Sequence, residues 1–138
     1  MTLDSLFLAF HVFGAILWVS GLVALTLLFS AAKAESDPAA RKRLLGFARK
    51  AGRVPDLGAT IAIVFGLHRL IALHYYKVHY MHAKLLFVVF LIGLHGFLRA
   101  KAKRGAESGE PNLPSFTPAL LLFFVLAIVF FVITKTPA

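Results

Sequence analysis

Hydrophobic residues fill four long stretches of the chain, and short polar segments separate them. Each stretch is close to the ~20 residues that an α-helix needs to cross a hydrocarbon core of ~30 Å. The pattern therefore predicts four membrane-spanning helices, over residues 6–32, 55–73, 80–98 and 116–133.

The composition agrees with this pattern. Of the 138 residues, 59% are hydrophobic and 14 are Phe, well above the apolar share of an ordinary soluble domain. No soluble domain fits between the spans. We therefore expect an all-α fold, in which residues 1–138 form one transmembrane four-helix bundle.

Lys and Arg gather in two segments, one after the first span and one after the third. By the positive-inside rule both segments are cytoplasmic, so both termini lie outside and the chain is a multi-pass protein of the inner (cytoplasmic) membrane. The net charge of +9 comes from these segments rather than from a folded basic face. Membrane lipid is therefore the expected partner, and nucleic acid is not.

The two basic segments differ in character. In the first, Asp37 is suited to the N-cap of a helix and Pro38 to its first position. Apolar and basic residues then alternate, which predicts a short amphipathic helix on the cytoplasmic leaflet, in contact with anionic lipid; a partner-binding site is the alternative. The second segment, residues 101–114, contains Gly, Pro and Ser and is predicted to be a flexible linker.

Ionisable residues inside the spans indicate a function or a specific partner, because placing such side chains in hydrocarbon costs free energy. A rise of ~1.5 Å per residue places several of them at one depth, in the outer half of the bundle. They are His11 of the first span, His68 and Arg69 of the second, and His82 and Lys84 of the third.

Helical phase arranges these residues in stripes. Gly14 and Trp18 share the stripe of His11, and Gly93 shares the stripe of His82. Small residues on such a stripe let a neighbouring helix or a flat ligand approach closely. Trp18 lies too deep for an aromatic belt, so it either packs in the core or stacks near a ligand.

Histidines at matched depth, with glycines beneath them and no Cys in the chain, provide what haem b requires. The favoured pair of iron ligands is His11 with His82, or His11 with His68. Arg69 and Lys84 are suited to the propionates. The simpler alternative is that these histidines bond across helices or reach the headgroups.

Two further ionisable residues lie towards the cytoplasmic side. Structural hydrogen bonding is the first interpretation of His95, and a proton relay or a quinone contact is the alternative. Asp56 falls in the first turn of its span, where a carboxylate interacts favourably with the helix dipole and can pair with the basic loop.

The stretches FHVFGAILWVSGL and YMHAKLLFVVFLIGLHGFL resemble the HemJ type of protoporphyrinogen oxidase and the related CopD membrane domains. The resemblance implies a b-type haem held by bundle histidines. It also implies oxidation of protoporphyrinogen IX to protoporphyrin IX, with electrons passed to quinone or to a protein. The matching residues are His11, Trp18, His82, Lys84, Leu85 and His95, of which Trp18, Lys84 and His95 would be catalytic.

The chain departs from the HemJ pattern at two places. It lacks an Arg at residues 26–29 and a Glu at residues 115–118. Two alternatives to an oxidase therefore stay open. One is a non-enzymatic haem-binding or electron-transfer subunit of a larger membrane complex, whereas an active homo-oligomer would count against this alternative. The other is a CopD-like copper protein. With two Met and no Cys, the chain has few of the soft sulfur ligands that Cu(I) prefers.

Overall fold

The computed structural model describes residues 2–74, 77 and 79–134. Within these ranges the chain is helical and contains no strand, which confirms the predicted all-α class. The helices are α1 (Leu3–Ala34), α2 (Pro38–Ala51), α3 (Arg53–Ala72), α4 (His79–Ser108) and α5 (Thr117–Thr134).

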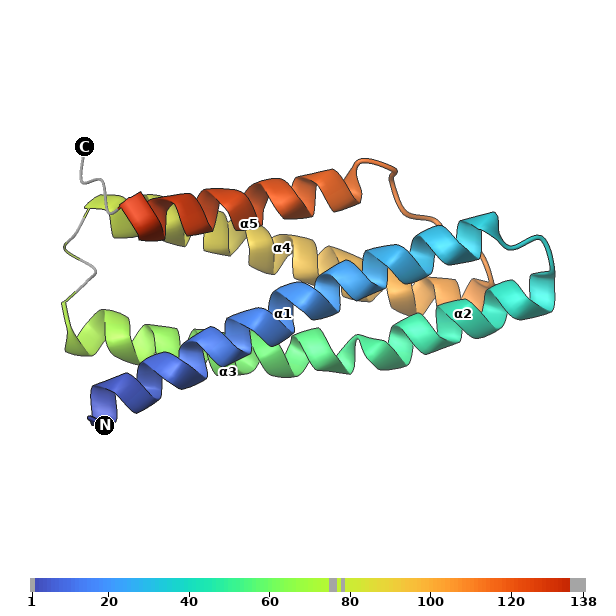
Figure 1. Ribbon diagram of the computed structural model, residues 1–138. Helices are drawn as coiled ribbons and strands as arrows, with labels where there is room; N and C mark the ends of the chain where they lie inside the picture. Colours follow the sequence, from blue (N-terminus) through green and yellow to red (C-terminus); the bar gives the residue numbers. More distant parts are fainter. Residues whose placement is uncertain (1, 75–76, 78, 135–138) are drawn as a thin grey trace.

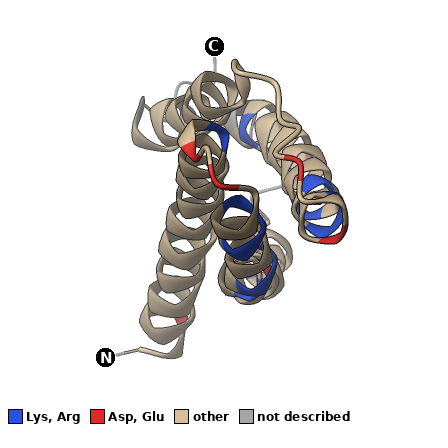
Figure 2. Ribbon diagram, turned by 90° about the vertical axis from the view of Figure 1, so that its right-hand side faces the viewer, with Lys and Arg blue, Asp and Glu red and all other residues tan. Residues whose placement is uncertain are grey.

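The helices run alongside one another in an elongated bundle (Figure 1). The start of α1 and the end of α5 lie at one end, which we call the terminal end. Helix α2 and the connection from α4 to α5 lie at the other, which we call the basic end. Figure 2 looks at the basic end and shows Lys and Arg on α2 and α4 there. The two basic segments therefore share one end of the bundle, and their cytoplasmic location stays a prediction.

Among the residues that the structure describes, three helical segments are long and apolar enough to cross a membrane: Leu3–Ala34, Pro38–Ala72 and Met81–Ser108. Helix α5 is apolar but shorter. Large apolar side chains such as Ile16, Leu27 and Leu126 are exposed along the bundle, as lipid-facing residues would be. The structure is thus compatible with a multi-pass membrane protein.

Glycines bring α1 and α3 into close contact. A Cβ atom added to Gly58 would lie 2.3 Å from the backbone nitrogen of Trp18, and one added to Gly14 would lie 2.5 Å from that of Ala62. Only a hydrogen atom fits at either position, so the two backbones can touch. The space beside Gly14 is therefore filled by α3, and in this arrangement it does not receive a flat ligand.

The hydrophobic core lies in the half of the bundle towards the basic end. Its largest apolar members come from four helices and are fully buried: Leu22, Leu25 and Phe29 of α1, Leu45 of α2, Leu98 of α4 and Leu121 of α5. Helix α1 contributes more of these residues than any other helix, so it lies at the centre of the core.

Helix α2 begins as predicted, with the Asp37 side chain accepting a hydrogen bond from the Ala40 backbone and Pro38 in the first turn. The helix runs into α3 and packs between α1 and α4. Leu45 and Ala48 are completely buried there, whereas Phe47 is 61% exposed, so only part of the apolar face packs inside the bundle. The expected contact of this helix with the cytoplasmic leaflet stays a prediction.

The predicted flexible linker is also wrong over residues 101–108, where α4 continues as helix to Ser108. Ala, Lys, Arg and Glu in this segment favour helix, and burial of Ala102 and Gly105 near Leu45 stabilises it. The helix ends at Gly109, whose φ of 78° requires the left-handed conformation that glycine adopts without strain.

The glycine contact between α1 and α3 gives a first prediction. Gly58→Ala should destabilise the protein by about 1–3 kcal/mol, because the added methyl group meets backbone that cannot move aside. Gly96→Ala is the matched control, since nothing lies within 4 Å of its added Cβ. We expect that variant to be unchanged or slightly stabilised. Thermal unfolding in detergent, followed by circular dichroism, measures both, and an equal response of the two variants would contradict the close helix contact.

Candidate functional site

A chain of polar side chains links α1, α3 and α4 in the half of the bundle towards the basic end. The Trp18 indole donates a hydrogen bond to Nδ1 of His95 across 3.1 Å. Nε2 of His95 lies 2.8 Å from Oδ1 of Asp56, and Nε of Arg99 lies 3.0 Å from the same oxygen. We call Trp18, His95, Asp56 and Arg99 the polar network.

The partners of His95 fix its protonation. An indole N–H can only donate, so Nδ1 of His95 must accept and carries no proton. Nε2 therefore carries the proton of the neutral ring and donates it to the Asp56 carboxylate. A second proton on the ring would remove the acceptor for Trp18. The arrangement thus engages both ring nitrogens of His95, one with Trp18 and one with Asp56.

Local sequence explains how these side chains meet. His95 and Arg99 are four residues apart on α4 and therefore lie on one helix face. Asp56 stands in the first turn of α3, where the packing of Pro55 against Gly21 holds the helix close to α1. The Arg99 guanidinium lies directly against Gly52, where any side chain would collide with it.

The four side chains of the polar network differ in burial. The side chain of Trp18 belongs to the buried core, and the exposed fractions are 16% for His95, 26% for Arg99 and 43% for Asp56. The single negative charge is thus held between a cation and a hydrogen-bond donor at the edge of the core. Such an arrangement joins helices firmly, but it leaves no unsatisfied group on His95 for a substrate.

A second group of polar residues lies towards the terminal end. Nδ1 of His11 is 2.8 Å from the backbone oxygen of Ala62, and the ring rests on Gly66, where an added Cβ would lie 2.7 Å from Cε1. A carbonyl oxygen can only accept, so Nδ1 of His11 carries the proton. The other nitrogen, Nε2, therefore presents a lone pair in the neutral ring.

The second-span residues contact α1. Arg69 forms an ion pair with Asp4 at 2.7 Å, and the His68 ring meets Phe7 edge-to-face at 4.7 Å between centroids. Both contacts hold α3 against the first turns of α1. His68 is exposed, and its ring packs on an aromatic neighbour.

Lys84 differs from the other basic residues near this end. It is half-buried, and it has no hydrogen bond or ion pair within the described part of the chain. The charge of Arg69 acts on it, and Lys84 in turn acts on His11. The three helices α1, α3 and α4 thus each bring one nitrogen group, from His11, Arg69 and Lys84, into electrostatic range of one another.

His82 and Gly93 lie on α4 and are both exposed. The space around Gly93 is open, with no atom within 4 Å of an added Cβ. In the ranges that the structure describes, no hydrogen bond joins His82 to His11, and no group of three or more His, Asp or Glu side chains is placed to hold a metal ion. The structure thus brings His11, Arg69 and Lys84 together and leaves His82 and Gly93 on the outside.

A haem needs one or two ligands, room beside them and cations for its propionates. His11 fits the requirement for a ligand, because metal-binding histidines commonly donate the second ring N–H to a carbonyl or carboxylate. Lys84 fits the requirement for a cation without a partner. The identity of a second ligand, His82 or His68, stays a prediction.

The polar network was only partly foreseeable. The sequence placed Asp56 correctly in the first turn of its helix, but its ion pair is with Arg99 of the second basic segment. Two features of the sequence could have indicated it. His95 and Arg99 are four residues apart, so a hydrogen-bond donor and a cation share one helix face, and Asp56 lies at a similar depth at the start of the second span.

Comparison with known proteins gives no relative. No family model, no curated protein and no solved structure matches the chain.

The polar network yields a second prediction, because Trp18 is the only tryptophan of the chain. His95→Leu removes the acceptor of the indole N–H, so the fluorescence emission should shift to shorter wavelength. We also expect a loss of about 1–3 kcal/mol in stability, since the buried indole donor is left unsatisfied.

His68→Leu is the matched control for this measurement, because it makes the same substitution far from the indole. Its emission should equal that of the unmodified protein. An unchanged emission maximum in His95→Leu would show that the bond between Trp18 and His95 does not form.

Proposed function

We propose that the chain is a b-type haem-binding membrane oxidoreductase of the HemJ kind, in which His11 ligates the iron. The observation that carries the proposal is the bond between Nδ1 of His11 and the Ala62 carbonyl. It fixes the ring orientation and leaves Nε2 as the basic nitrogen, which is the state an axial ligand needs. Gly66 supports this role, because the absence of a side chain lets the edge of the ring with Cε1 and Nδ1 lie close against α3.

Lys84 supports the same proposal from another helix. A half-buried amine without a partner is unfavourable in a membrane-embedded bundle unless an anion joins it. The propionates of a haem would supply that anion, and the charge of Arg69, which also pairs with Asp4, acts on the same region. Bound haem would supply one-electron redox chemistry, and the protein would supply the ligand, the positive charge and the exclusion of water.

The proposed reaction is oxidation of protoporphyrinogen IX to protoporphyrin IX, with electrons passed to a membrane acceptor such as quinone. It is supported by the resemblance of residues 10–22 and 80–98 to the HemJ pattern. Of the residues that the resemblance marks as catalytic, Lys84 has an available polar group. Trp18 and His95 are already engaged with each other.

One observation favours a second function, which is haem binding without oxidase chemistry. Both ring nitrogens of His95 are occupied, by Trp18 and by Asp56, so this residue cannot exchange protons with a substrate while the polar network is intact. The absence of the family's Arg and Glu at residues 26–29 and 115–118 points the same way. On this proposal the protein would be an electron-transfer subunit of a larger complex.

The decisive measurement is the reduced-minus-oxidised absorption spectrum of the purified protein. We expect the α band of a b-type haem in the unmodified protein and its loss in His11→Ala. His74→Ala is the control, because that residue lies in the turn after α3 and should not alter the spectrum. A purified, folded protein without a haem band would overturn the proposal, and metal analysis of the same sample would show whether copper is bound instead.

Gly66→Ala tests the role of His11 without removing the ligand. The added methyl group would press on the ring, so we expect haem affinity to fall by about 10–100-fold, as when a residue supporting a metal ligand is changed. His82→Ala and His68→Ala then identify a second ligand by the same spectrum. Restoration of growth in a strain without its own protoporphyrinogen oxidase separates the two proposed functions, because only an oxidase restores it.

A further inference from the structure

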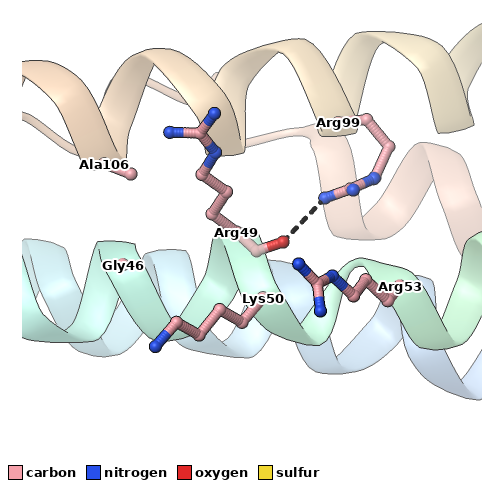
Figure 3. Close-up of a pocket in the computed structure, with 6 residues that line it drawn as sticks. All are labelled: Gly46, Arg49, Lys50, Arg53, Arg99 and Ala106. Atoms are coloured by element: carbon pink, nitrogen blue, oxygen red, sulfur yellow. Dashed lines mark hydrogen bonds between the residues drawn. The ribbon is translucent and has the colours of Figure 1, made fainter.

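A pocket of about 470 Å³ opens at the basic end, between α2, the start of α3 and α4. Figure 3 shows Arg49 extending from α2 towards Ala106 of α4, with Arg99 extending from α4 into the space beside it. The pocket is bounded by four cations and two small residues: Arg49, Lys50, Arg53, Arg99, Gly46 and Ala106. Its size falls within the range of small-ligand sites.

The position of Arg99 in this pocket is fixed. Its Nε bonds to both oxygens of Asp56, at 3.0 and 3.2 Å, and one terminal nitrogen donates to the backbone oxygen of Arg49 at 3.0 Å (Figure 3). One wall of the pocket is therefore a guanidinium group that is held in place before any ligand arrives. Preorganised donors of this kind bind anions without an ordering penalty.

The other three cations have no counter-charge. Arg49, Lys50 and Arg53 form no ion pair within the described part of the chain, and Asp56 is already shared by Arg99 and His95. The residues that line the pocket carry four positive charges, and Asp56, which pairs with Arg99, supplies one negative charge. The excess of positive charge selects for an anion.

The level of the pocket along the bundle indicates the source of that anion. On one side it lies where the polar helix α2 gives way to the apolar helix α3. On the other side it lies just beyond the apolar part of α4, which ends at Leu98. Both helices thus change from apolar to charged at the same level, which is where a bilayer has its phosphate groups.

We propose that this pocket is a binding site for a phosphate group, supplied by the headgroup of an anionic phospholipid. Arg99 and Arg49 would contact the phosphate oxygens from opposite walls, and Lys50 and Arg53 would add charge at the entrance. Guanidinium groups suit this role because their paired N–H groups match the geometry of phosphate oxygens. The site is independent of the proposed haem, which concerns the other end of the bundle.

The test is native mass spectrometry of the purified protein with added phosphatidylglycerol, and with phosphatidylcholine as the lipid without net charge. We expect one tightly held phosphatidylglycerol per chain and no comparable retention of phosphatidylcholine. Replacing Arg49, Lys50 and Arg53 together by Gln should weaken binding by roughly 100-fold, since each basic residue facing an anionic lipid contributes about fivefold. If that variant fails to fold, Lys50→Gln alone should weaken binding by about fivefold.

The matched control replaces Arg43, Lys103 and Arg104 by Gln. It removes an equal number of positive charges, from α2 and α4, at residues that do not line the pocket, and all three side chains are exposed. The control should keep the tightly held lipid. Equal weakening in the two triple variants would overturn the proposal, because it would show a diffuse electrostatic attraction and no site.

A second arm uses inorganic phosphate and distinguishes the source of the ligand. If millimolar phosphate displaces the lipid from the unmodified protein, the pocket recognises the phosphate group itself. If phosphate has no effect and the lipid stays bound, the site requires the lipid headgroup. Binding of inorganic phosphate without retention of phosphatidylglycerol would assign the pocket to a soluble phosphate compound. If the protein binds neither phosphatidylglycerol nor inorganic phosphate, the proposed phosphate site is refuted.

Discussion

The carboxylate of Asp56 is the point on which three helices depend. It comes from the first turn of α3, it bonds to His95 and Arg99 of α4, and through His95 it orients the indole of Trp18 in α1. An ionised carboxylate at the edge of an apolar bundle is tolerated only when it is paired and hydrogen-bonded, and this one has both kinds of partner. The same pairing orients the ring of His95 and immobilises the guanidinium of Arg99.

The two ends of the bundle therefore present different functional groups. Towards the terminal end, His11 offers a ring nitrogen and Lys84 offers an amine that has no partner among the described residues, and this is the end where we propose that a haem binds. At the basic end, the immobilised Arg99 forms the wall of a positively charged pocket. The polar network lies between these two regions, and its own polar groups are satisfied within the protein.

The sequence predicted the parts of this structure that depend on periodicity and composition. The apolar stretches located α1, α3, α4 and α5, and Asp37 with Pro38 located the start of α2. It did not predict that α4 continues over residues 101–108, because turn-forming residues concealed a helix that Leu45 stabilises from another segment. It also did not predict the side-chain partners of His95. Those depend on how α1 and α3 are rotated against α4, which Gly14, Gly58 and the core decide together.

The central claim is that Trp18 and Asp56, which do not touch each other, are coupled through His95. A double-mutant cycle with Trp18→Phe and Asp56→Asn measures this coupling by unfolding in mixed micelles, followed by circular dichroism. We expect the two substitutions to be non-additive by about 0.5 kcal/mol or more, and the coupling to vanish when the cycle is repeated in His95→Leu. Additive effects in the unmodified background, or a coupling that survives the loss of His95, would contradict the account.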